Sequence, residues 1–353
     1  TTVLTLNRGA DGSGGMLIND SANRSLSLLN HGKVIIGPNG GTIAATTNTT
    51  LTVAQNIEFG TNELVIGSAE PVDGYPAKHG TVMLSAPAGY STAGAGSRIL
   101  VITNAILRNA ADAIPDETDI VVDGTFSMGG QETIGSLAGG GRVILGSTLT
   151  LGRNGKSTSF PGDFAAGGTI VKTGTGRFDI VSSVTNHGVY AVNGGTLAFS
   201  GNGRQLTTNA STTAYTLYDG GTLLLDNSEN NDIDRLAGPL RGITFQGGAF
   251  RFIGMSGEAS GEELGPATFG LGASTIDVVN GAGASSEIRF SSAVPGYGTI
   301  KFTASNGTLG APGANPRVYF NSGMTLGAVV PYATVGNAPA YYDATYGIRA
   351  YTL

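Results

Sequence analysis

The sequence has 353 residues, a net charge of −6 and only 19 lysines and arginines, which are spread without clusters. A basic patch is the usual footprint of a nucleic-acid-binding protein, so nucleic acid is excluded as a partner. The absence of cysteine excludes disulfides and thiolate metal sites.

Composition gives two opposing indications about order. The 58 glycines are typical of a low-complexity chain, whereas 40% hydrophobic and 12% charged residues favour a buried core. Because the glycines recur among short apolar runs, order is favoured. No apolar run is long enough to span a bilayer, and the start at Thr1 lacks signal-peptide features. We therefore interpret the chain as a mature or excised segment without a transmembrane segment.

Residues 1–97 contain brief apolar runs that predict strands at a closer spacing than in the rest of the chain. These runs lie at 3–6, 16–18, 26–29, 34–36, 43–45, 51–53 and 64–66. Between residues 67 and 97, prolines and glycines predict two long loops around a strand at 81–84. Such loops are either recognition elements or tolerated insertions, and both interpretations stay open.

Residues 104–113 are the segment with helical spacing. Ile106, Ala110 and Ala113 would lie on one side, and Pro115 would stop the helix. We expect one or two helical turns here.

Residues 139–201 predict short strands bounded by Gly, Asn or Ser. The expected strands are 142–145, 148–151, 169–172, 177–180, 189–192 and 196–199. Glycine doublets recur through and beyond this region at a nearly constant interval. They end at Gly141, Gly168, Gly195, Gly221 and Gly248, so successive positions differ by 27, 27, 26 and 27. A constant interval of this size is typical of a solenoid, in which each repeat buries its apolar face against its neighbours.

Three strands and three turns fit into each interval, which predicts an all-β, parallel β-helix of about 13 coils of three short strands. We expect one elongated domain over residues 1–353. It comprises less regular N-terminal coils with loop insertions at 1–97, regular repeats at 98–270 and C-terminal coils at 271–353. Five residues of the repeat are expected to point inward: Ile170, Phe178, Leu197, Leu223 and Phe250.

The central region resembles a known family. The run GSLAGGGRVILGSTLTLGRNGKSTSFPGDFAAGGTIVKTGTGRFDIVSS, followed by GVYAVNGGTLAFSG, is similar to the autotransporter-associated β-strand repeat of large bacterial surface and secreted proteins. KTGTG at 172–176 and NGGTL at 193–197 match its pattern. Fainter matches at 113–116, 225–236 and 272–277 extend the resemblance over roughly residues 100–350. The resemblance implies a right-handed parallel β-helix exported to the cell surface, in a scaffold family without catalytic residues.

The C-terminal region predicts further strands at 275–279, 287–290, 299–303, 317–320 and 347–353. Its end is rich in tyrosine: Tyr332, Tyr341, Tyr342, Tyr346 and Tyr351. These rings either form an adhesive patch or shield the last coil. Both ends of the chain are strand-like, at 2–6 and 348–353, and lack the proline, lysine run or covering helix that protects an open edge. Copies that stack head to tail would form a filament.

Candidate catalytic residues are few. His31, His79 and His187 lie in turn-like contexts without a nucleophile elbow, so we interpret them as turn residues. Because some parallel β-helices act on polysaccharides, paired carboxylates on one face are candidate catalytic groups. The acids in question are Asp226, Asp232, Asp234, Glu258, Glu262 and Glu263. They are expected in loops, without neighbouring aromatic or basic residues, which favours solvated loop charge.

Residues 9–14 are faintly similar to calcium-binding glycine and aspartate repeats, but they occur once and such sites need tandem copies. The sequons at Asn19, Asn23, Asn48, Asn209 and Asn306 are what this composition yields by chance. We assign no catalytic, cofactor-binding or metal-binding residue.

Two functional hypotheses remain. The first is a non-catalytic structural or adhesive scaffold of a bacterial cell-surface or secreted protein, located outside the cell. Its partners would be surface glycans, other surface proteins or further copies of itself, stacked end to end. The alternative is a polysaccharide lyase or glycoside hydrolase with a groove along one face of the helix.

Overall fold

The computed structural model describes residues 2–9, 15–20, 22–28, 32–68, 77–86, 91–185, 188–206, 214–239 and 241–352. The described residues form β-strands and turns and contain no helix. The chain divides into two compact units, Thr1–Ile170 and Val171–Leu353, each described by itself below. A single domain over the whole chain stays a prediction.

Among the described residues, three parallel sheets lie wholly within unit 1. The three-stranded sheet comprises β1 (Val3–Leu6), β4 (Lys33–Ile36) and β7 (Asn56–Glu58). The six-stranded sheet has the order β15 (Ser136–Ala138), β12 (Asp119–Val122), β10 (Arg98–Val101), β8 (Glu63–Ile66), β5 (Gly41–Ala45) and β2 (Met16–Asn19). The seven-stranded sheet has the order β19 (Asp163–Ala165), β16 (Arg142–Ile144), β13 (Thr125–Met128), β11 (Ile106–Asn109), β9 (Thr81–Leu84), β6 (Thr50–Val53) and β3 (Arg24–Leu26). Further strands of unit 1 are β14 (Glu132–Ile134), β17 (Thr148–Leu151) and β18 (Thr158–Phe160), and β20 (Thr169–Lys172) crosses the division.

Unit 2 also contains three main sheets, which we name here. The threonine sheet has β23 (Tyr190–Val192), β26 (Tyr215–Tyr218), β28 (Ile243–Gln246), β31 (Ala267–Leu271) and β34 (Ala293–Pro295). The long sheet has β21 (Arg177–Ile180), β24 (Gly195–Phe199), β27 (Gly221–Asp226), β29 (Ala249–Ile253), β32 (Ala273–Val279) and β35 (Thr299–Ser305), and continues into β37 (Ala328–Val335), β38 (Ala338–Asp343) and β39 (Gly347–Ala350). The short sheet has β30 (Ser260–Leu264), β33 (Ser286–Phe290) and β36 (Arg317–Phe320), and β22 (Ser183–Val184) pairs with β25 (Arg204–Gln205).

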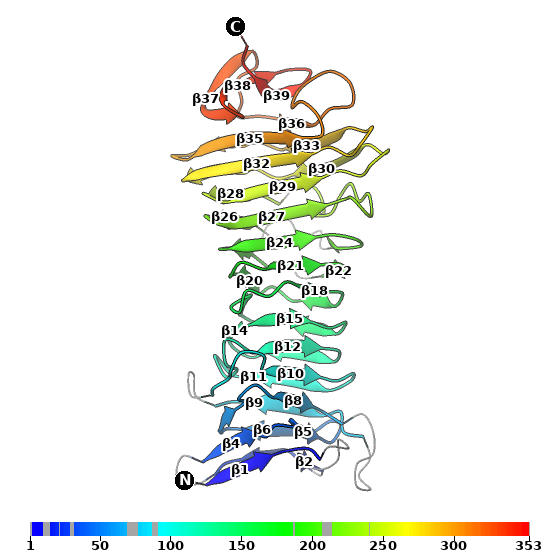
Figure 1. Ribbon diagram of the computed structural model, residues 1–353, viewed down its shortest axis with the longest axis vertical. Coiled ribbons are helices and arrows are strands. Elements are labelled where there is room, and N and C mark those ends of the chain that lie inside the picture. Colours follow the sequence, from blue (N-terminus) through cyan, green and yellow to red (C-terminus); the bar gives the residue numbers. More distant parts are fainter. Residues whose placement is uncertain are drawn as a thin grey trace. The chain divides into compact units, whose positions relative to one another are not determined.

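Successive strands join different sheets, and in regular stretches each strand pairs with the third strand after it. In unit 1, β4, β5 and β6 pair with β7, β8 and β9. In unit 2, β31, β32 and β33 pair with β34, β35 and β36. Figure 1 shows β24, β27, β29, β32 and β35 stacked in this order. All these pairs are parallel, so the chain returns to the same sheet in the same direction.

The core lies between the sheets and is filled by alternate residues of each strand. Leu197 pairs with Leu223, Leu223 with Phe250 and Phe250 with Ile276, and all four side chains are fully buried. The five residues expected to point inward are at most 1% exposed, which confirms their assignment. Parallel register stacks like side chains on one another and removes their apolar surface from water.

The glycine interval is confirmed in unit 2 and wrong in unit 1. In unit 2, Gly195 pairs with Gly221, so one coil spans one interval between doublets. In unit 1, β16 follows the first doublet, and its Arg142 pairs with Thr125 on one side and with Asp163 on the other, so both coils are shorter than the interval. The second doublet precedes β20, a strand of another sheet. The ladder fixes only the pairing of strands, so turns of different length are accommodated. The estimate of 13 coils assumed a constant number of residues in each coil, and this assumption is wrong in unit 1.

The recurring glycines allow close approach of neighbouring backbones. A Cβ atom at Gly221 would lie 2.1 Å from the carbonyl oxygen of Val192, and Gly195 has φ of +61°. Any side chain would displace the turn at Gly221, and an L-residue would be strained at Gly195.

The predicted helix at 104–113 is wrong, because residues Ile106–Asn109 form β11. This strand pairs with β9 on one side and with β13 on the other. Leu107 and Asn109 are buried while Arg108 is exposed, which is a period of two. Hydrogen bonding of four residues to strands on both sides stabilises the strand more than one or two isolated helical turns would stabilise a helix.

Most other sequence expectations about strands are confirmed. Each apolar run expected in residues 1–66 lies at least in part in a strand, and 81–84, 148–151, 169–172 and 177–180 match β9, β17, β20 and β21. The two loops flanking β9 include residues 69–76 and 87–90, which lie outside the described residues.

The lysine of the KTGTG segment, Lys172, stabilises two turns. Lys172 is fully buried, and its Nζ donates to the carbonyl oxygens of Thr173, Gly174 and Gly194. Burial lowers the pKa of Lys172 to about 8. The ammonium group thus joins the turn that follows β20 to the turn that precedes β24.

The tyrosine-rich end packs against the last parallel strands of unit 2. Strands β37, β38 and β39 are antiparallel to one another (Figure 1). The Tyr342 hydroxyl donates to the carbonyl oxygen of Phe320 at 2.6 Å and accepts its N–H at 2.9 Å. Ala340 and Ile348 are fully buried. This arrangement agrees with the hypothesis that tyrosines shield the last coil.

Leu197→Asp tests the inward ladder. It places an unpaired carboxylate among stacked apolar side chains, so we expect a loss of more than about 4 kcal/mol and unfolding of at least the neighbouring coils. Thr196→Asp at the adjacent outward position is the control, with an expected change within about 1 kcal/mol. Urea denaturation measures both, and a parent-like midpoint for Leu197→Asp would contradict the ladder.

Candidate functional site

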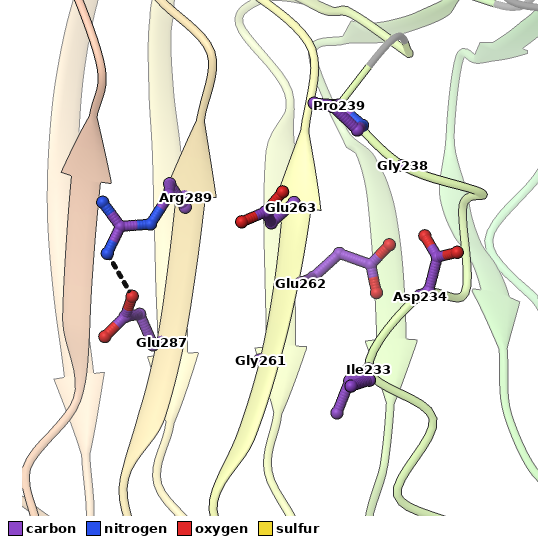
Figure 2. A pocket seen from close by; sticks show the side chains of 9 residues that line it. All are labelled: Ile233, Asp234, Gly238, Pro239, Gly261, Glu262, Glu263, Glu287 and Arg289. Atoms are coloured by element: carbon purple, nitrogen blue, oxygen red, sulfur yellow. Dashed lines mark hydrogen bonds and ion pairs between the residues drawn. The ribbon is translucent and has the colours of Figure 1, made fainter.

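A cleft of about 520 Å³ lies in unit 2, between the segment that follows β27 and the outer part of the short sheet. Its lining contains four acids and one base. The lining residues are Ile233, Asp234, Gly238, Pro239, Gly261, Glu262, Glu263, Glu287 and Arg289 (Figure 2). This concentration of titratable groups makes the cleft the candidate site.

Glu262 is the buried acid of the cleft. In β30, alternation places Ser260, Glu262 and Leu264 inward, and Glu262 is 2% exposed. Its Oε2 accepts the backbone N–H of Arg235 at 3.0 Å, and its Oε1 accepts that of Leu236 at 2.9 Å. Burial raises the pKa of Glu262 to about 8, although these two N–H groups act in the opposite direction.

Asp234 is the second acid at the inner wall, and in Figure 2 the Glu262 side chain extends toward the segment that carries Asp234. Partial burial raises the pKa of Asp234, and the negative charge of Asp232 adds to the effect. The hydrogen bond from the Gly238 backbone lowers it. Two acids with raised pKa values in one cleft are a feature of acid catalysis. The hydrogen-bond partners of these acids therefore decide between a catalytic and a structural role.

The segment that carries Asp234 is held by a buried arginine. Arg235 is fully buried, and its guanidinium donates to Asn227 Oδ1 and to the carbonyl oxygens of Gly201, Gly203 and Asn230. These bonds join the segment to the preceding turn of the chain. The backbone N–H groups that Glu262 accepts are therefore fixed in place.

The outer wall of the cleft belongs to β30 and β33. Glu263 follows Glu262 on the opposite side of β30 and is exposed. Arg289 forms an ion pair with Glu287 and lies 4.4 Å from the ring centroid of Tyr319. These groups hold Arg289 along the wall rather than across the cleft.

The arrangement of Glu262 has a counterpart in unit 1. Glu132 is 1% exposed, and its Oε2 accepts the consecutive backbone N–H groups of Ala113 and Ile114 at 3.1 and 3.2 Å. Asn109 donates to the same oxygen at 2.8 Å. Burial raises the pKa of Glu132 to about 8. A buried glutamate that receives two consecutive N–H groups of an earlier turn thus occurs in both units, which indicates a structural role.

Six acids were candidates for a catalytic carboxylate pair and were expected in loops, but three of them lie in strands. Asp226 ends β27, and Glu262 and Glu263 belong to β30. The expected absence of basic neighbours is also wrong. Arg235 lies beside Glu262, and Arg289 belongs to the cleft wall. Two consecutive acids in a strand face opposite sides, so the SGEEL sequence contained a signal that one acid is buried.

The remaining candidates are placed as follows. His79 lies outside the strands, between β8 and β9, whereas His31, His187, Asn209 and residues 10–14 of the calcium-like segment lie outside the described residues. Asn19 is buried, and Asn48 and Asn306 have positive φ angles. Within the part of the chain that the structure describes, no group of three or more acids and histidines is arranged to hold a metal ion. That part likewise contains no helix of the length and apolarity that crossing a membrane requires.

The pH dependence of stability tests both buried glutamates. Their pKa values are raised from 4.5 to about 8, so between these values the folded state binds more protons than the unfolded state. The stability that each contributes is fully present below pH 4.5 and is lost as the pH rises through 8. Glu262→Gln and Glu132→Gln should each flatten this decline in thermal melts between pH 4 and 9. Glu263→Gln, at the exposed neighbour, is the control, and an unchanged slope in Glu262→Gln would overturn the assignment.

Comparison of the sequence and structure with protein-family models, curated proteins and solved structures found no match. The resemblance of residues 135–201 to the autotransporter-associated repeat therefore stays a prediction.

Proposed function

We propose that this protein is an extracellular structural or adhesive scaffold of a bacterial cell-surface or secreted protein and that it is not an enzyme. The observation that carries the proposal is the repeated parallel return of the chain to the same sheets, with stacked apolar side chains inside. Such a ladder is stiff along its axis and leaves all outer faces available for contact. Stiffness with exposed faces is what a surface spacer needs.

The proposed architecture of each unit is a right-handed parallel β-helix. Parallel pairing over successive three-strand returns supports it, and right-handed crossover is the general rule for parallel strands. The resemblance at 135–201 supports the same architecture and export from the cell. The absence of cysteine is common in proteins that cross an envelope unfolded, and it supports export.

The partners of Glu262 support a non-catalytic role for the cleft. Both carboxylate oxygens of Glu262 accept backbone N–H groups, and Glu132 likewise accepts two consecutive backbone N–H groups, both at Oε2. A general acid must have an oxygen directed to substrate. Glu262 is thus better explained as an anchor for the segment around Arg235.

The second candidate is an enzyme that acts on polysaccharides. It is favoured by the presence of Glu262 and Asp234, both with raised pKa values, in one cleft of about 520 Å³. A glycosidase needs one protonated and one ionised carboxyl across the bond that it cleaves.

Incubation with polysaccharides separates the two candidates. The scaffold proposal expects no new reducing ends and no unsaturated products from neutral or acidic polysaccharides, from pH 4 to 8. Product release that is lost in Asp234→Asn but retained in Glu258→Gln, which changes an exposed acid outside the cleft, would establish the enzyme instead.

End-to-end self-association stays a prediction. Among the described residues β1 pairs with β4 alone, and Val3 is exposed. Light scattering over a concentration series should show growing rods, which Leu4→Lys abolishes by charging this edge. A strict monomer at high concentration would overturn the prediction.

A further inference from the structure

The threonine sheet of unit 2 differs chemically from the other two sheets. Its strands β23, β26, β28, β31 and β34 contain no charged residue. In the long sheet, by contrast, Arg251 pairs with Asp277 at 3.3 Å, and in the short sheet Arg289 pairs with Glu287. The strands of this sheet are thus uncharged, and the exposed acid Asp219 follows directly after the end of β26.

The uncharged face presents hydroxyl groups in register. Thr216 pairs with Thr244, and Thr244 pairs with Thr268, on consecutive strands. All three are half-buried, at outward positions between inward neighbours. Their spacing equals the strand separation of about 4.8 Å, which gives a regular row of hydrogen-bonding groups.

A second row beside the threonines contains aromatic, amide and aliphatic side chains, and a register shift lies between Phe245 and Gln246. Tyr218 pairs with Gln246, and Gln246 with Leu271, while the Tyr297 N–H donates to the carbonyl oxygen of Gly270. Tyr218 is 44% exposed and Tyr297 is 93% exposed. A ring as exposed as Tyr297 adds almost nothing to the core, so folding does not explain it.

We infer that this face binds an uncharged polysaccharide. Hydroxyl and amide groups in a row can exchange hydrogen bonds with sugar hydroxyls, and exposed tyrosine rings offer flat apolar surfaces to the C–H faces of sugar rings. An acidic or basic partner would find no counter-charge on these strands, so charge complementarity favours a neutral ligand. Leu271 and Val294 are also exposed on this face, at 60% and 41%, and add apolar contact surface beside the hydroxyl and amide groups. The inference rests on the proposed scaffold function and specifies its partner.

Affinity electrophoresis in gels that contain amylose, mannan or a neutral β-glucan tests the inference, with polygalacturonate as the anionic comparison. We expect retardation by at least one neutral polysaccharide and none by polygalacturonate. Thr244→Glu, which places a charge in the middle of the face, should weaken binding at least tenfold. Tyr297→Ala should weaken it severalfold.

Two matched controls define the face. Thr222→Glu changes the same residue type at an outward position of the long sheet, and Tyr351→Ala removes a half-exposed ring from the C-terminal end. Both should bind as the parent does, and all variants should keep its melting temperature. Absence of retardation by every neutral polysaccharide would overturn the inference. So would retardation by polygalacturonate alone, or equal losses in Thr222→Glu and Thr244→Glu.

Two further measurements distinguish failure of polysaccharide binding at this face from failure of the proposed scaffold function. A change in particle mass on Thr244→Glu, measured by light scattering, would identify a second copy as the occupant and overturn the inference. Reducing ends released from a bound polysaccharide would overturn the non-catalytic scaffold while leaving binding at this face in place.

Discussion

In-register parallel pairing of backbones is the constraint on which the rest of each unit depends. Once β24 pairs with β27, and β27 with β29, the side chains of Leu197, Leu223 and Phe250 stack on one another, because the register places them directly opposite. An apolar residue at each inward position then stabilises the ladder along its length. The same register aligns the outward residues, so surface chemistry is arranged in rows.

Coils differ in their number of residues, and the difference lies in the turns because the strand pairing is fixed. The sequence separation of paired residues is small between Thr125 and Arg142 and about twice as large between Glu63 and Arg98. Buried ionisable groups fix several of these turns, namely Lys172 through three carbonyl oxygens and Glu132 and Glu262 through backbone N–H groups. Each group supplies partners that turn backbone would otherwise lack. Perturbed pKa values in this protein thus follow from architecture.

The distribution of charge connects the architecture to the proposed role. Ion pairs lie along the long and short sheets, where Arg251 meets Asp277 and Arg289 meets Glu287. The threonine sheet carries hydroxyl, amide and aromatic groups in their place. A solenoid offers several long faces of independent chemistry around one core, so adhesion can be assigned to one face without altering the fold.

The sequence by itself determined the strands, because glycine-bounded β-branched runs such as 148–151 and 177–180 have one compatible local structure. It also determined which side chains enter the core and that the pairing is parallel and repetitive. Tertiary structure decided the length of each coil, since pairing depends on distant strands and turns of different length serve equally well. It decided against a helix at 106–109, where pairing on both sides outweighed local spacing. It also decided the burial of Glu262, because only the arrangement of β30 beside the segment around Arg235 brings the carboxylate to its two N–H partners.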